Sequence, residues 1–431
     1  MSATAAEPRV SGPVFHRRKS LMHRVALSLM WITVALSSIV LSEPAPTDVL
    51  TIGLFVLLPV VGLVDGKPLV AAMFAVWLAI QGFCYLGATS AFEVPAALMH
   101  TSVSLYLSGA AFLFAAFVAR RPAQHAQLIL NAYLFAAVMA AGLGLIGYFD
   151  LIPGSYDALT RYDRVSGPFK DPNVFGPFLV APLMTCLHNW LTRPLLRGIL
   201  PLALAALLSG GILLSFSRGA WVGAGIAFAI YSTFYMIGAQ RQADRLKLVM
   251  LVLVGTATVG LVLGAALQSG SARQLLNERM ALTQPYDEGP EGRFGGQEKA
   301  IGVILSNPFG IGGVQFSPYI HHEEPHNVYL NMLMAGGWAG GLLYISLCLA
   351  IVVAGFHHAL KPTRTRGLFL IVFGALVATI LQGFLIDSDH WRHFYLLMGL
   401  TVGLMAGDGR AMRRPTIVRD LSLLEPEVPS G

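Results

Sequence analysis

The seven residues HHEEPHN at positions 321–327 combine side chains that bind metals with side chains that move protons. His322, Glu323 and His326 match the H-E-x-x-H pattern, which holds zinc in metalloproteases when both histidines face one side of a continuous helix. Pro325 breaks such a helix, because proline disfavours the helical conformation in the residue before it but suits the first turn of a helix that follows. We therefore expect a helix to begin at about Pro325, with His326 in its first turn, and a zinc site here is disfavoured.

His326 is followed by Asn327 and an apolar run with glycine pairs at 336/340 and 337/341. Small residues four positions apart let a second helix approach closely in a membrane. An imidazole at the mouth of such a bundle can exchange a proton near neutral pH. A histidine that only hydrogen-bonds a neighbouring loop is the structural alternative.

Two arginines have the chemistry of an anion site. Arg218 lies in SFSRGAWVGAG, at the outer end of an apolar run, and Arg293 lies in the polar segment GPEGRFGGQEKA. The planar guanidinium fork suits phosphate oxygens, although Arg218 could instead be an interfacial anchor and Arg293 a solvated loop charge. Residues 269–325 hold four Lys/Arg against seven Asp/Glu, so phosphate recognition must come from a few placed arginines rather than from a general positive field.

Residues 150–171 form a second long polar segment. It carries three further candidate cations, Arg161, Arg164 and Lys170. The segment leads into Asp171-Pro172-Asn173, where an aspartate before a proline is typical of a capped helix start. Asn173 could equally contact a substrate.

The elements that must position these residues are membrane helices. The 431 residues are 55% hydrophobic and only 12% charged, whereas soluble domains carry roughly 25% charged residues. The apolar runs approach the ~20 residues of a membrane-crossing helix and lack the alternation of a barrel. The sequence therefore predicts an all-α polytopic membrane protein with about 12 transmembrane helices. The predicted spans are 25–42, 49–64, 68–86, 94–118, 126–149, 172–191, 198–214, 218–237, 247–268, 326–355, 366–386 and 392–407.

The distribution of Lys and Arg predicts the orientation of these spans. Twenty of the 29 fall on the side that holds both termini, and positively charged loops stay cytoplasmic. The net charge of +6 follows from this topology, so no nucleic-acid partner is expected. The predicted parts are a cytoplasmic arm at 1–24, helices 1–9 over 25–268, a large outer loop at 269–325 between helices 9 and 10, helices 10–12 over 326–407, and a cytoplasmic tail at 408–431. Helical spacing within the outer loop, at 271–282 and 293–305, predicts short helices that cover the bundle.

Four stretches in order resemble the O-antigen ligase and polysaccharide polymerase superfamily of bacterial envelope enzymes. They are RVSGPFKDPNVFGPFLVAPL, LLSFSRGAWVGAGIAF, EGRFGGQEKAIGVILSNPFGIGGVQF and PHNVYLNMLMAGGWAGGLLYI. The resemblance covers roughly residues 150–345 together with the twelve-span plan, which is GT-C-like. It implies a multi-pass protein of the bacterial inner membrane whose active site faces the periplasm.

The resemblance also implies a reaction. The enzyme would move a glycan from undecaprenyl diphosphate to an acceptor sugar, either a lipid A core or a growing polysaccharide, with inversion and without a metal or cofactor. Carried over by motif, Arg218, Arg293 and His326 would be the functional residues. Phe294 and Gln297 stand where relatives often place a tryptophan, so the motif around Arg293 departs from the family pattern.

The chemistry of that reaction fits these residue types. A lipid diphosphate leaves as an anion, so Arg218 and Arg293 would stabilise the growing charge in a water-poor site. His326 would accept the proton of the attacking hydroxyl, with Glu323 and Glu324 as alternative bases. The predicted substrate contacts are Lys170, Arg161, Arg164, Asn173, Asn327 and Glu323.

Two other functions stay open from the sequence. One is a twelve-helix transporter of a lipid-linked or anionic substrate, and the other is a membrane metalloprotease built on the H-E-x-x-H pattern. A transporter should place ionisable residues within its spans and show similarity between its halves. In this sequence the charges lie almost wholly at the ends of the spans.

Overall fold

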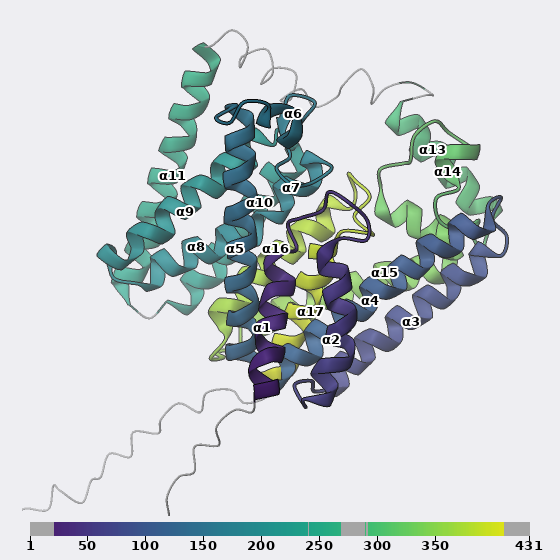
Figure 1. The fold of residues 1–431 in the computed structure, drawn as a ribbon, viewed down its shortest axis with the longest axis horizontal. Coiled ribbons are helices and arrows are strands. Elements are labelled where there is room, and N and C mark those ends of the chain that lie inside the picture. Colours follow the sequence, from purple (N-terminus) through teal and green to yellow (C-terminus); the bar gives the residue numbers. More distant parts are fainter. Residues whose placement is uncertain (1–20, 240, 269–288, 290–291, 409–431) are drawn as a thin grey trace, which may run out of the picture.

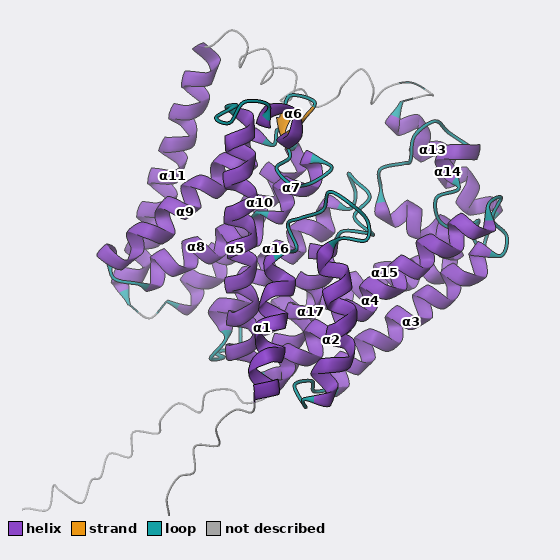
Figure 2. Cartoon of the chain, in the orientation of Figure 1, coloured by secondary structure: helices purple, strands orange, loops and turns teal. Residues whose placement is uncertain are grey.

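The computed structural model of the chain describes residues 21–239, 241–268, 289 and 292–408. Helices form nearly all of the regular structure in this part of the chain (Figure 2). A short antiparallel hairpin, β1 (Thr160–Arg161) and β2 (Arg164–Val165), lies in the segment between α6 and α7. The helices are α1 Leu21–Ala35, α2 Pro46–Val60, α3 Pro68–Ala88, α4 Val94–Arg120, α5 Pro122–Tyr148, α6 Ser155–Leu159, α7 Pro172–Phe178, α8 Val180–Thr192, α9 Leu195–Leu214, α10 Arg218–Gly238, α11 Gln242–Gln268, α13 Arg293–Ser306, α14 Phe316–Tyr319, α15 Val328–Ala359, α16 Arg366–Gln382 and α17 Arg392–Gly407.

Each of the twelve apolar ranges predicted from the sequence coincides with a helix, with α7 and α8 together forming the sixth. Among the described residues, seven helical segments are long and apolar enough to cross a membrane, and α1, α2 and α16 are shorter apolar helices. The prediction of an all-α polytopic membrane protein is confirmed, whereas the count of twelve stays a prediction. Helix α13 confirms the helix predicted at 293–305, and the one predicted at 271–282 lies outside the described residues.

The bundle is built around α16 and α17. Helices α8 to α11 stand on one side of this pair, and α3, α4 and α15 stand on the other (Figure 1). Glycines allow the central helices to approach their neighbours at backbone distance. A Cβ on Gly399 of α17 would lie 2.6 Å from the carbonyl oxygen of Ala111 on α4, and a Cβ on Gly374 of α16 would lie 2.9 Å from that of Ala227 on α10.

One of the two predicted glycine pairs of α15, 336/340, packs against another helix, whereas Gly337 meets Pro308 and Phe309 and Gly341 meets Leu333 of its own helix. A Cβ on Gly336 would lie 3.0 Å from the sulfur of Cys84, and one on Gly340 would lie 3.0 Å from the Cβ of Phe83. Both contacts are with α3, so the glycines let α15 lie close along that helix.

Helix α15 is broken at Gly337, whose φ of 64° and ψ of −169° are not helical. In an unbroken helix the Trp338 amide would donate to the carbonyl oxygen of Met334. Instead, that amide donates to Pro308 O at 3.0 Å, and Met334 O accepts from the amide of Ile311 at 2.8 Å. The segment that precedes α14 therefore supplies both partners of the missing helical hydrogen bond.

We expect Gly337→Ala to destabilise the protein by at least about 2 kcal/mol, because its backbone conformation is one that essentially only glycine adopts. The new Cβ would also collide with Pro308 O and the backbone of Phe309. The midpoint of thermal unfolding in detergent measures the effect. Gly142→Ala, on α5 with no atom within 4 Å of the new Cβ, is the matched control and should leave the midpoint unchanged or raise it slightly, because alanine favours a helix more than glycine does. Equal midpoints for the two variants would contradict this account of the break.

Three helix starts next to candidate site residues are fixed by side-chain caps. An oxygen of the cap accepts a hydrogen bond from an amide of the first turn, which otherwise has no partner. Each capping residue lies within two positions of a candidate site residue that was predicted from the sequence. The caps are Asp171 for α7, Ser217 for α10 and Asn327 for α15. The predicted capping role of Asp171 is confirmed, with its carboxylate 2.7 Å from the Asn173 amide.

Candidate active site

His326 lies outside the helix that was predicted to contain it. The side chain of Asn327 accepts hydrogen bonds from the amides of Tyr329 at 3.0 Å and Leu330 at 3.3 Å, so α15 begins at Val328 rather than at about Pro325. His326 itself adopts a left-handed conformation with φ of 47°. Such a conformation costs a residue with a side chain about 1 kcal/mol or more, so the surrounding contacts must hold His326 in it.

The ring of His326 faces a carboxylate from the segment that joins α16 and α17. His326 Nδ1 lies 3.3 Å from one oxygen of Asp387, and the side-chain amide of Asn331 donates to the other at 2.5 Å. Asn331 is one helical turn after the cap of α15. Asp387 is thus held between two groups of the same helix start, and it fixes the orientation of the imidazole, leaving Nε2 for other partners.

The two groups of this pair shift one another's acidity. The hydrogen bond to Asp387 raises the pKa of His326 above its ordinary value, and burial of the ring and the charge of Arg293 oppose this only in part. Burial raises the pKa of Asp387, while its hydrogen bond with His326 acts in the opposite direction. The imidazole is therefore a stronger base than a free histidine.

The helix that a zinc-protease site requires is absent from this part of the described chain. His322, Glu323 and His326 lie in an irregular segment between α14 and α15. The nearest approach of Glu323 to the His326 ring is 3.9 Å, at Nε2. The sequence argument from Pro325 against the metalloprotease geometry agrees with this conformation.

Arg293 is the first residue of α13 and lies against the same segment. Its guanidinium donates to the carbonyl oxygen of His326 at 3.3 Å and also to that of Leu385. Gln297, one turn further along α13, donates to the carbonyl oxygen of Pro325 at 3.1 Å. Helix α13 therefore fixes the backbone on which the histidine stands, and it brings a positive charge beside the ring.

Arg218, the first residue of α10, borders the same end of α16 from another side. Gly219 packs directly against the side chain of Gln382, the last residue of α16. The next residue, Gly383, accepts a hydrogen bond from the Val328 amide at 2.9 Å, at the start of α15. The C-terminal end of α16, residues 382–385, thus lies between the helix that Arg218 begins and the segments that carry His326 and Arg293.

Arg164 and Asn173 stand next to the start of α10. Arg164 is buried, and its guanidinium donates to Ser215 O and to the side-chain oxygen of Asn173, both at 2.7 Å. These hydrogen bonds connect the β-hairpin, α7 and the turn before Arg218. Both residues were predicted as substrate contacts, and the structure gives them a role in holding that turn in place.

The other two predicted cations lie further along the same polar segment. Lys170 forms an ion pair with Glu43 at 3.2 Å, and both side chains are more than half exposed. Arg161 donates to the carbonyl oxygens of Asp157 and Thr160, both at 2.8 Å, so it folds back on its own hairpin. Neither contacts the His326 segment through a hydrogen bond or ion pair that the structure shows.

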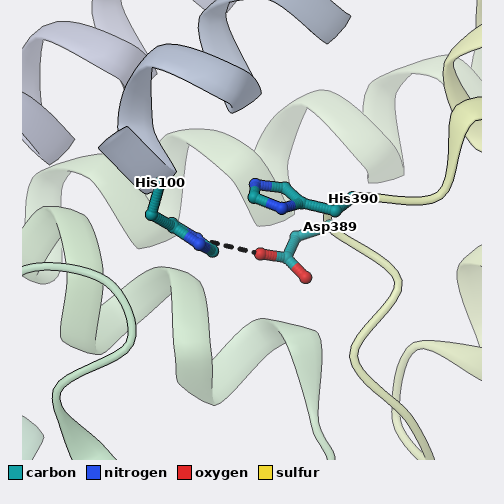
Figure 3. Close-up of side chains that lie close together, drawn as sticks. All are labelled: His100, Asp389 and His390. Atoms are coloured by element: carbon teal, nitrogen blue, oxygen red, sulfur yellow. Dashed lines mark ion pairs between the residues drawn. The ribbon is translucent and has the colours of Figure 1, made fainter. Parts of the chain in front are cut away.

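A second half-buried carboxylate follows two residues after Asp387. Asp389 forms an ion pair with His100 of α4 at 3.2 Å, and the rings of His100 and His390 stack with centroids 4.2 Å apart (Figure 3). Burial alone would raise the pKa of Asp389, but the hydrogen bond from His100 and the proximity of His390 hold it below its ordinary value. Two carboxylates two residues apart are therefore shifted in opposite directions, which is typical of catalytic sites.

The cluster of His100, Asp389 and His390 offers ligand atoms within 4.8 Å of one another, close enough for a metal ion. The two rings are stacked rather than converging edge-on, and the side chain of Ser104 already bonds His390 Nε2 at 2.9 Å. This arrangement favours an ion-pair network that fixes the segment carrying Asp387 to α4.

The alternative bases Glu323 and Glu324 point in different directions. Glu323 approaches the His326 ring, whereas the carboxylate of Glu324 accepts from the Ser317 amide at 3.2 Å and lines a cavity of about 210 Å³ with Asp387 and Asp389. Burial raises the pKa of Glu324 above its ordinary value.

Asp387 was not singled out from the sequence. The segment LIDSDH, at residues 385–390, holds two aspartates and a histidine between the last two predicted spans. Topology alone would have placed it on the same face as His326, so the concentration of ionisable residues in so short a link was the available signal.

Comparisons with known proteins find a match to the part of the chain that contains Arg218, Arg293 and His326. A family model described as O-antigen ligase matches residues 203–345, which include Arg218, Arg293 and His326 but not Asp387. A curated protein of Pseudomonas aeruginosa named O-antigen ligase is 28% identical over 280 residues, which are 63% of this chain and 63% of that protein. The match thus spans just under two thirds of the relative's length. Both findings support the resemblance to the O-antigen ligase superfamily.

Proposed function

Because residues 203–345 match the O-antigen ligase family within a polytopic membrane protein, we propose that the chain is a membrane glycosyltransferase. It moves a glycan from undecaprenyl diphosphate to an acceptor sugar, which is a lipid A core or a growing polysaccharide. The reaction takes place at the periplasmic face of the inner membrane, inverts the anomeric carbon and requires no metal.

The observation that carries the proposal is the paired His326 and Asp387 with Arg293 beside them. Asp387 orients the imidazole and raises its basicity, and Nε2, which lies 3.9 Å from a carboxylate oxygen of Glu323, accepts the proton of the acceptor hydroxyl. The hydroxyl oxygen bonds to the anomeric carbon as the bond from that carbon to the diphosphate oxygen breaks. The diphosphate leaves with the bonding electrons.

Arg218 and Arg293 stabilise the departing diphosphate. The helices that they begin border the same end of α16, which supports a joint action of both arginines on one polyanion. Fixed cations in a site with little water act more strongly than solvated ones and need no reorganisation during the reaction. Arg164 supports this arrangement indirectly, through the turn that precedes Arg218.

Purified protein in liposomes tests the function. Supplied with a lipid-linked glycan and lipopolysaccharide with an unmodified core, it should form the joined product and release undecaprenyl diphosphate. Movement of the donor across the bilayer without product would support a transporter and would contradict the proposal. Gene deletion separates the two acceptors, since loss of a ligase leaves polymer not joined to lipid A, and loss of a polymerase leaves single repeats.

We expect the transfer rate to rise with pH through the raised pKa of His326, because only the neutral ring accepts a proton. In Asp387→Asn the charge that raises this pKa is gone, so the rising limb should move to lower pH. The maximal rate should also fall by at least about tenfold, because the ring loses its orienting partner. Measuring kcat from pH 5 to 9 checks both effects.

Asp163→Asn is the matched control for this experiment. Asp163 accepts a hydrogen bond from Tyr156 on the exposed hairpin, away from the His326 segment. Its pH profile should equal that of the wild type. A wild-type profile in Asp387→Asn would remove the aspartate from the mechanism.

A further inference from the structure

A cavity of about 250 Å³ lies beside the candidate site, between α1, α2, α4 and α17. The segment 169–171 and the link between α16 and α17 close its upper part. Asp387 forms part of its wall, so the cavity reaches the carboxylate that holds the ring of His326.

Much of the cavity wall is apolar and rich in aromatic side chains. Aliphatic side chains, among them Leu107 and Leu396, also line it. Ligand sites commonly combine such walls with a few placed polar groups. The aromatic residues are Tyr106, Phe114, Phe169, Phe178, Trp391 and Tyr395.

The upper wall is charged, but its cations are already paired. Arg392 forms a two-pronged ion pair with Asp48, at 2.8 and 2.6 Å, and Lys170 pairs with Glu43. Two further carboxylates, of Asp171 and Asp387, line the cavity. A carboxylate has about four acceptor positions, and the structure shows only some of them in use here.

The excess of carboxylates over cations in the cavity wall disfavours the diphosphate of the donor and favours the sugar of the acceptor. Four carboxylates against two cations repel a diphosphate, whereas they accept hydrogen bonds from sugar hydroxyls. Aromatic rings suit the apolar C–H face of a pyranose. The arginines that suit a diphosphate, Arg218 and Arg293, lie outside the cavity wall.

We propose that this cavity binds the terminal sugar of the acceptor saccharide, separately from the arginines that bind the donor diphosphate. The assignment rests on the proposed transferase function. It adds that the acceptor sugar and the donor diphosphate bind in separate places. The acceptor sugar lies in the acidic and aromatic cavity, the diphosphate lies at the arginines, and His326 with Asp387 stands at their junction.

Ala110→Leu tests the assignment, because Ala110 lines the cavity and the larger side chain reduces its volume. We expect the KM for the acceptor to rise at least tenfold, while the KM for the lipid-linked donor stays within twofold of the wild type. Ala79→Leu is the control, since Ala79 lies on the exposed face of α3 and should leave both constants unchanged. An unchanged acceptor KM, or a rise in the donor KM alone, would overturn the assignment.

A binding measurement separates this proposal from the transferase function. Core oligosaccharide freed of lipid A, and repeat-unit oligosaccharide freed of its carrier, are titrated while the fluorescence of tryptophan is followed, since Trp391 lies in the cavity wall. One of them should give a saturable change in the wild type that weakens at least tenfold in Ala110→Leu. If the wild type binds a saccharide in this way but transfers no glycan, only the proposed reaction fails. If it transfers glycan and Ala110→Leu binds both saccharides like the wild type, only the cavity assignment fails.

Discussion

We expect His326→Ala to lower the rate of glycan transfer by about 10²- to 10⁴-fold, the range that a positioned general base contributes. The protein should still insert and elute as a folded species in detergent, because the side chain of His326 is partly exposed and contacts Asp387 and Glu323 rather than the packed core. Transfer is measured with lipid-linked glycan and acceptor at saturating concentrations, so that kcat is observed directly.

His322→Ala is the matched control for this variant. It removes the same side chain four residues earlier, from an exposed position in the same irregular segment. It should retain most of the activity. If both variants were equally active, the role of His326 as the base would be wrong. If both were equally inactive, the loss would come from disruption of the whole segment rather than from removal of a base.

Arg218→Ala should reduce the transfer rate by about 10²- to 10³-fold, the usual loss when one group that stabilises a developing anion is removed. The effect should fall on kcat more than on the KM of the donor, because the charge on the diphosphate oxygen grows in the transition state. Arg218→Lys should recover part of the rate, since it restores the charge without the planar fork.

Arg161→Ala is the comparison for Arg218. It also removes a guanidinium, but one that bonds the carbonyls of its own hairpin. It should keep nearly full activity. Near wild-type kcat in Arg218→Ala would exclude the arginine from the reaction, and an equal loss in both variants would indicate a general electrostatic effect instead.

The sequence predicted the helices well, because membrane helices leave a strong signal in composition and length. All twelve apolar ranges overlap helices, and one glycine pair of α15, 336/340, correctly indicated close packing against another helix. The start of α15 was placed three residues too early. Proline at 325 was taken as the first helical residue, whereas the capping side chain of Asn327 determines where the helix begins.

Partners from distant parts of the chain were harder to predict. Asp387 is far from His326 in sequence and belongs to a link that joins two other helices, so only the packed bundle shows that they meet. Arg164 was predicted as a substrate contact on charge alone. Its hydrogen bonds to Ser215 and Asn173 depend on the path of the β-hairpin, which spacing and composition do not encode.

The break in α15 bears on how the large loop can be manipulated. At Gly337, roughly 15 Å along the helix from its start, two backbone groups are satisfied by residues that belong to the loop. In hydrocarbon each of these groups would lack any substitute partner, since no water is available there. Excision of residues 308–311 would consequently leave the Trp338 amide and the Met334 carbonyl without these partners, and a shortened loop intended to uncover the candidate active site would instead compromise the helix that supports it.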